Sequence, residues 1–169
     1  QSNFLTLENG SRIHYRDQGQ SAGLPILLVH GAMASLHTWE PWVQVLGENY
    51  RLVTLDLPAH GLTGQVPNEE YGADAFTAAI EAVANELGLD SFVLGGNSMG
   101  GGATWRYALE NSDRVRAMVL IDSVPPNHWA RAELEPGQMS GPTAFSLLRQ
   151  GWFKAIARNL DPALLIGQG

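Results

Sequence analysis

The 169-residue sequence contains no cysteine. It therefore has no disulfide framework, no thiolate metal ligand and no thiol nucleophile. Basic residues are also few, with 10 lysines and arginines against 17 aspartates and glutamates, so the formal charge is −7. Because the recognition of nucleic acids and anionic membranes needs clustered lysine and arginine, this balance argues against both kinds of partner.

Long hydrophobic runs are absent as well. The apolar stretches are short, such as residues 26–29, and fall far below the roughly 20 residues that span a bilayer. The first residues do not form a charged and then apolar leader. We therefore expect a soluble protein without a membrane span, with the cytoplasm as the default compartment. At 44% apolar residues, the chain has enough side chains for a core.

The apolar residues of the sequence follow two patterns. Short runs without strict alternation are typical of parallel strands buried on both faces, and they cover residues 26–29, 52–55, 92–94 and 115–121. Apolar residues at intervals of three and four predict helices between them, over residues 39–46, 73–87 and 99–109. An antiparallel hairpin is predicted before the first run, over residues 4–15. The order predicts a doubly wound α/β fold that places ligands at the carboxyl ends of the strands.

The clearest motif is Gly96-Asn97-Ser98-Met99-Gly100, which follows one predicted strand and begins a predicted helix. A G-x-S-x-G sequence in this context is typical of a nucleophilic serine held in a sharp turn, where small flanking residues avoid collisions with the bent backbone. The alternative is a glycine-rich turn whose serine only caps the helix. We interpret Ser98 as a nucleophile.

A second motif, His30-Gly31-Ala32-Met33, comes directly after the predicted strand at residues 26–29. A serine that attacks a carbonyl needs two backbone N–H groups to hold the oxyanion of the intermediate. We expect these from Ala32 and from Met99, the residue after the nucleophile. His30 precedes Ser98 and stands at a strand end, so we expect it to brace the loop and not to act as the base.

A third motif, Asp56-Leu57-Pro58-Ala59-His60-Gly61, follows the strand at residues 52–55. The three motifs, in this order and on these elements, resemble the α/β-hydrolase superfamily over nearly all of residues 3–123. The family loop usually reads D-x-P-G-x-G, and Ala59 stands here in place of its first glycine. The resemblance implies the α/β-hydrolase fold, with a mostly parallel sheet and a helical cap, and it implies structural roles for Asp56 and His60 in binding loop backbone.

The resemblance also implies an activity. A serine at the elbow implies an acyl-enzyme, whereas relatives that dehalogenate alkanes or open epoxides look alike but carry an aspartate there. We therefore expect a cofactor-independent and metal-independent hydrolase that cleaves a carboxylic ester of a small to medium apolar substrate. One alternative is a hydrolase of carbon–carbon bonds in meta-cleavage-type dienoates. Another is a non-catalytic ligand-binding or assembly fragment on the same fold.

The partners of the nucleophile are harder to place. In the family the acid and then the histidine follow the serine, but His128 is the only histidine after Ser98 and we do not assign it as the base. Asp122, at the end of the run 115–121, is a candidate acid. The family has two further strands, so we interpret the chain as a fragment whose C-terminal part belongs to the same or a second chain. The alternative is a reduced variant without a complete triad.

The resemblance divides the sequence into a core of six strands, residues 1–123, and an incomplete helical cap, residues 124–169. Helical spacing over residues 142–160 predicts an amphipathic helix in the cap. Its apolar side chains either cover the active-site mouth or pack against the core. We expect the substrate pocket to be lined by Met33, Trp129, Phe145, Leu148 and Trp152.

Overall fold

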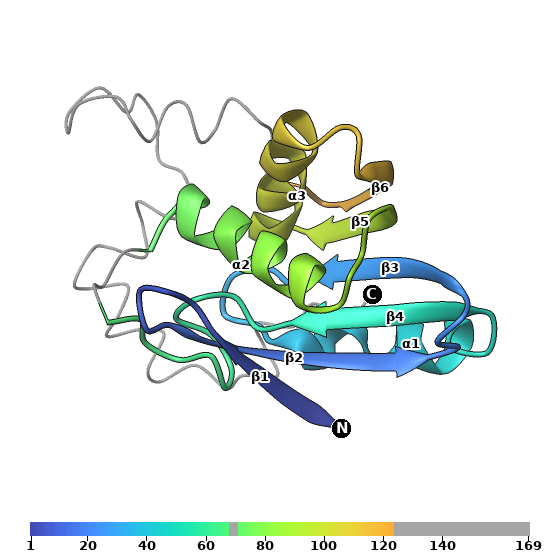
Figure 1. Cartoon of the computed structure of the whole chain (residues 1–169), viewed down its shortest axis with the longest axis horizontal. Coiled ribbons are helices and arrows are strands. Elements are labelled where there is room, and N and C mark those ends of the chain that lie inside the picture. The colour runs from blue at the N-terminus through green and yellow to red at the C-terminus, as the bar shows by residue number, and fades with distance from the viewer. Residues whose placement is uncertain (68–70, 124–169) are drawn as a thin grey trace. The chain divides into compact units, whose positions relative to one another are not determined.

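The computed structural model describes residues 1–67 and 71–123. Within these ranges six strands form one sheet in the order β1-β2-β4-β3-β5-β6 (Figure 1). The strands are β1 (Ser2–Thr6), β2 (Arg12–Gly19), β3 (Leu24–Val29), β4 (Tyr50–Leu55), β5 (Phe92–Asn97) and β6 (Val115–Ile121). The helices are the 3-10 helix η1 (Leu36–Trp39), α1 (Glu40–Leu46), α2 (Ala73–Glu86) and α3 (Met99–Glu110). The pairs β4/β3, β3/β5 and β5/β6 are parallel, as predicted.

Both faces of the central strands are covered. Leu27 and Val29 of β3 belong to the larger apolar cluster, which includes side chains of α2 and α3. Ile26 and Leu28 belong to a second cluster, which side chains of α1 join. Successive residues of a strand point to opposite faces, so α2 and α3 cover one face and α1 the other. In Figure 1, α2 and α3 lie across the same side of the sheet.

The N-terminal hairpin is confirmed. β1 and β2 pair antiparallel, and the turn between them closes through a hydrogen bond from the Leu7 N–H to the Ser11 carbonyl at 2.8 Å. Gly10 has a φ of +82° in this turn, a conformation that glycine adopts without steric cost. β2 runs further than predicted, to Gly19, because it also pairs antiparallel with β4.

The helix ends follow their sequence signals closely. α2 ends in a Schellman motif, in which the Gly88 N–H bonds to Asn85 O at 3.1 Å and the Leu89 N–H bonds to Ala84 O at 2.8 Å. Gly88 has a φ of +60°, as expected of the capping glycine. The helix predicted from residue 39 begins one residue later, because Trp39 is the last residue of η1.

One strand is less covered than its sequence predicts. β6 is an end strand among the described residues, and its residues 116–118 are exposed. The apolar composition of residues 115–121 predicted a strand buried on both faces. Burial also depends on neighbouring strands, and among the described residues β6 pairs with β5 on one side. None of the helices within the described ranges is long and apolar enough to cross a membrane.

Candidate active site

Ser98 lies in a one-residue turn between β5 and α3. Its φ of 52° and ψ of −115° belong to a region that L-residues rarely adopt. The Ser98 N–H donates to the Ile121 carbonyl at 3.0 Å, and Asn97 Nδ2 donates to the same oxygen at 3.1 Å. The turn is therefore tied to the carboxyl end of β6, and the Ser98 side chain is half-buried.

The glycines that flank Ser98 are required by close packing. A Cβ at Gly100 would lie 2.4 Å from the carbonyl oxygens of Val29 and His30, and a Cβ at Gly96 would lie 2.4 Å from Gly100 O. Real Cβ atoms essentially never approach backbone so closely. The expectation that small residues are needed on both sides of the serine is confirmed, and the reason is that α3 begins directly against the end of β3.

The loop after β3 lies against the Ser98 turn. A Cβ at Gly31 would be 3.2 Å from Ser98 Cβ and 2.9 Å from Asn97 Oδ1. Neither the Ala32 N–H nor the Met99 N–H has a hydrogen-bond acceptor among residues 1–67 and 71–123. Among the described residues, two backbone donors, one from each loop, are thus left without an acceptor at the carboxyl ends of β3 and β5, where the serine stands. Acyl-transfer sites use such donors to hold an oxyanion.

His30 braces this loop, as expected. Its Nε2 accepts a hydrogen bond from the Leu57 N–H at 3.0 Å, and its Nδ1 contacts the Gly31 carbonyl at 2.7 Å. The ring is fully buried. Burial lowers the pKa of His30 and the nearby His60 ring also lowers it, against the opposing effect of the Gly31 hydrogen bond. Both ring nitrogens are occupied by backbone groups.

Asp56 is the centre of a buried network that ties three segments together. Oδ1 accepts from the Leu36 N–H at 2.7 Å, and Oδ2 accepts from the Leu62 N–H at 2.9 Å. Oδ2 also lies 2.7 Å from His14 Nδ1. Burial on its own raises the pKa of Asp56, but these hydrogen bonds outweigh it, and the net pKa is lowered. The predicted binding of loop backbone by Asp56 is confirmed.

In the same loop, Ala59 stands where the family usually has glycine, and its backbone conformation is one that glycine adopts more easily. Ala59 has a φ of +69°, in the left-handed region that glycine favours. Its N–H bonds to Gly64 O at 2.7 Å, which closes the bend. His60 donates from Nδ1 to Pro58 O at 2.9 Å, so it also binds loop backbone, as expected.

The candidate acid lies among the described residues, whereas every described histidine is engaged with a partner other than Ser98. Asp122 follows β6 with an exposed side chain and a φ of +43°, one residue beyond the carbonyl that binds the Ser98 N–H. Every described histidine holds a partner other than Ser98 through a ring nitrogen: His14 with Asp56, His30 with Leu57 and Gly31, His37 with Glu40, and His60 with Pro58.

The sequence-predicted site is therefore brought together in part. Ser98, Ala32, Met99 and Asp122 all follow or begin elements at the carboxyl ends of β3, β5 and β6. Met33, next to Ala32, has a φ of +57° and is 83% exposed. The other expected pocket residues, together with the residue considered and set aside as a base, lie outside the described residues: Trp129, Phe145, Leu148, Trp152 and His128.

Sequence reasoning missed the role of His14. This residue is 1% exposed between two buried neighbours, Ile13 and Tyr15, and it is the side chain that pairs with Asp56. The available signal was a histidine between two apolar residues of the predicted hairpin, since a polar side chain that becomes buried needs a partner. The identity of that partner depends on a contact across 42 residues.

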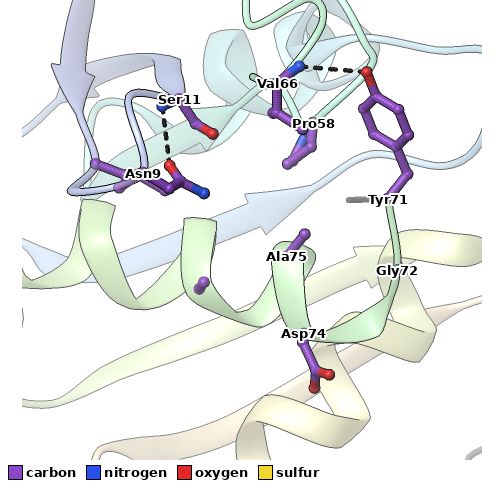
Figure 2. Close-up of a pocket in the computed structure, with 10 residues that line it drawn as sticks. Asn9, Ser11, Pro58, Val66, Tyr71, Gly72, Asp74 and Ala75 are labelled. Atoms are coloured by element: carbon purple, nitrogen blue, oxygen red, sulfur yellow. Dashed lines mark hydrogen bonds between the residues drawn. The ribbon is translucent and has the colours of Figure 1, made fainter. Parts of the chain in front are cut away.

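A cavity of about 550 Å³ lies elsewhere, between the β1–β2 turn, the loop after β4 and the N-terminus of α2 (Figure 2). The Tyr71 hydroxyl accepts from the Val66 N–H there at 3.3 Å. Neither Ser98 nor the two open N–H donors line this cavity. No group of three or more metal-binding side chains occurs in the part of the chain that the structure describes.

The fold and the geometry of the Ser98 turn define the class of protein, and comparison with known families agrees. The family model for the α/β hydrolase fold matches residues 25–155, and the chain belongs to this family.

Individual relatives are more diverse. The chain is 37% identical to an N-formylmaleamate deformylase of Pseudomonas putida over 118 residues, 70% of this chain and 43% of the relative. It is also 37% identical to a non-heme haloperoxidase of Rhodococcus erythropolis over 125 residues, 73% of this chain and 44% of the relative. A solved meta-cleavage product hydrolase of Pseudomonas fluorescens superposes with a TM-score of 0.64 at 28% identity, covering 73% of this chain and 44% of that one. The chain thus spans less than half the length of these relatives.

Proposed function

We propose that this chain carries the nucleophile and the oxyanion donors of a serine hydrolase that cleaves carboxylic esters of small to medium apolar substrates. The main support is the placement of Ser98 in a strained strand-to-helix turn, beside two backbone N–H groups that lack acceptors among the described residues. A serine used only as a helix cap needs neither feature. Here the Ser98 side chain makes no capping hydrogen bond.

The proposed reaction has two stages. Ser98 Oγ gives its proton to a base, attacks the ester carbonyl, and the N–H groups of Ala32 and Met99 stabilise the oxyanion of the tetrahedral intermediate. The C–O bond to the alcohol breaks, the alcohol leaves with the proton from the base, and an acyl-enzyme remains. Water then hydrolyses the acyl-enzyme by the same steps. No cofactor takes part in this scheme.

The base and the acid complete the proposal. We assign the base to a histidine that is not His128 and not one of the four described histidines, because those four are engaged elsewhere. Asp122 is the candidate acid, since it follows the strand whose carbonyl binds the Ser98 N–H. The proposed pocket includes Met33, and residues 124–169 are proposed to form the cap over it.

A carbon–carbon hydrolase is the second candidate. It is supported by the 28% identity to a meta-cleavage product hydrolase, and it would use the same serine and the same oxyanion donors. The bond that breaks would then join a carbonyl carbon to a carbon of the dienoate. Substrate preference separates the two reactions.

The test compares hydrolysis of p-nitrophenyl acetate and butyrate with hydrolysis of a 2-hydroxy-6-oxo-dienoate by the full-length polypeptide. We expect faster turnover of the esters and covalent labelling of Ser98 by a fluorophosphonate. Ser98→Ala should abolish both, and the matched control Ser112→Ala, at an exposed position, should leave both intact. A preference for the dienoate would replace the ester proposal with the second candidate. The absence of turnover and of labelling would support a binding module instead.

A further inference from the structure

The protonation state of His30 follows from its partners. The Leu57 N–H is a donor, so Nε2, 3.0 Å away, must carry a lone pair. The Gly31 carbonyl only accepts, so Nδ1, 2.7 Å away, must carry the proton. The hydrogen-bond network therefore assigns a neutral imidazole with the proton on Nδ1. Protonation of Nε2 would place an N–H against the Leu57 N–H inside a fully buried site.

The carbonyl that His30 holds belongs to the same peptide unit as the Ala32 N–H. No peptide bond in the described residues is cis, and in a planar trans peptide the C=O and N–H point in opposite directions. The Nδ1–H bond to Gly31 O therefore sets the direction of the Ala32 N–H, which points away from the buried ring. It also polarises the peptide, since hydrogen bonds in a chain strengthen one another.

We propose that His30 is a positioning residue, whose neutral ring clamps the Gly31–Ala32 peptide so that the Ala32 N–H is held ready for the oxyanion. This inference rests on the proposed function, because it needs an oxyanion to be formed at Ser98. It extends that function because the buried His30 side chain then contributes to the rate of hydrolysis. His30 does not touch the substrate and moves no proton.

The ring itself is held by the Asp56 network. Leu57, which donates to His30 Nε2, directly follows Asp56, and Asp56 Oδ1 lies 3.9 Å from Nε2. The His60 ring packs at 5.1 Å between centroids. The order of contacts is therefore Asp56, the Leu57 N–H, the His30 ring, the Gly31 carbonyl and finally the Ala32 N–H. The loop that begins at Asp56 takes no part in the reaction, but through His30 it sets the direction of the Ala32 N–H.

Two substitutions separate this role from simple bracing. In His30→Asn the amide nitrogen takes the position of Nδ1 and still donates to Gly31 O, but the acceptor for the Leu57 N–H is lost. In His30→Gln the amide oxygen takes the position of Nε2 and still accepts from Leu57, but the donor to Gly31 O is lost. We expect His30→Gln to lower kcat about tenfold to hundredfold with KM nearly unchanged, and His30→Asn to retain most of kcat.

The experiment measures kcat, KM and thermal unfolding of the full-length protein and both variants, together with the affinity for an alkyl boronic acid that forms a tetrahedral adduct on serine. Boronate affinity should fall in parallel with kcat in His30→Gln. The exposed His37, changed to Gln, is the matched control and should behave as the wild type. Equal losses in the two variants, or a larger loss of kcat in His30→Asn, would overturn the inference while leaving the hydrolase intact. A wild type without turnover would overturn the proposed function itself.

Discussion

Two loops at the carboxyl ends of the parallel strands use their polar groups in opposite ways. The Ser98 segment, residues 96–100, joins β5 to α3, and the Asp56 loop, residues 56–63, follows β4. In the Ser98 turn the backbone is strained and the Met99 N–H is left without an acceptor among the described residues. In the Asp56 loop the carboxylate accepts from two backbone N–H groups and pairs with a histidine.

This difference distinguishes a candidate reactive site from a structural site at the end of a strand. Both loops place a polar residue at the carboxyl end of a parallel strand, where ligands bind in α/β folds. A group whose hydrogen bonds are all used within the protein stabilises the fold, and a group left open is available for a substrate. The comparison predicts that substitutions in the Ser98 turn change activity more than stability, and that substitutions in the Asp56 loop do the reverse.

The largest expected effect is that of Ser98→Gly. Turnover should fall about 10⁴-fold or more, because the nucleophile is removed. The free energy of unfolding should rise by about 1 kcal/mol, since glycine adopts the φ of 52° without the strain that serine bears. Ester hydrolysis and urea denaturation measure the two effects. Ser98→Ala, which loses the nucleophile but keeps the strain, is the control, and equal stability of the two variants would contradict the strain argument.

Asp56→Asn should show the reverse pattern, with the larger change in stability. The amide replaces a buried carboxylate oxygen with a donor that faces a backbone N–H, so we expect a loss of about 3 kcal/mol in the free energy of unfolding. Urea denaturation measures this loss. Asp90→Asn, at an exposed position, is the matched control and should change stability by less than about 0.5 kcal/mol. A loss in Asp56→Asn no larger than in this control would remove the structural interpretation of the loop.

The pH dependence of stability gives a second test of the structural role of Asp56. The folded pKa of Asp56 is lowered from an unfolded value of about 3.9. Its contribution is therefore present above the unfolded value and is lost as the pH falls through the folded pKa. Between pH 7 and pH 3, the wild type should lose more stability than Asp56→Asn, by about 1.4 kcal/mol for each unit of pKa shift fully titrated. Parallel losses in the two proteins, measured in urea at both pH values, would contradict this assignment.

The smallest expected effect comes from an ion pair that belongs to neither loop. Arg51 of β4 bonds to Asp17 of β2 through Nε at 3.0 Å and through the second guanidinium nitrogen at 2.7 Å. Because the pair is partly exposed, it should contribute about 0.5 kcal/mol. A double-mutant cycle with Arg51→Ala and Asp17→Ala measures this coupling. A coupling as large as the effect of Asp56→Asn would show that the Asp56 loop is not distinctive.

Much of the fold was predictable because its signals are local. The Schellman cap at Gly88 and the turn at Gly10 use positive φ angles that glycine adopts without steric cost, and Gly96 packs against Gly100, four residues away. Apolar runs marked the parallel strands. The prediction was less good for β6, because its burial depends on which strand lies beside it.

The sequence by itself determined the strand–turn–helix around Ser98, since the apolar run 92–94, the G-x-S-x-G segment and the helical spacing of residues 99–109 are local patterns. Only the tertiary structure decided that His14 pairs with Asp56 and that His30 joins Leu57 to Gly31. The physical reason is distance along the chain: His14 and Asp56 are 42 residues apart and His30 and Leu57 are 27 apart. Which polar groups meet across such distances depends on the order and register of the strands, and no local pattern of residues carries that information.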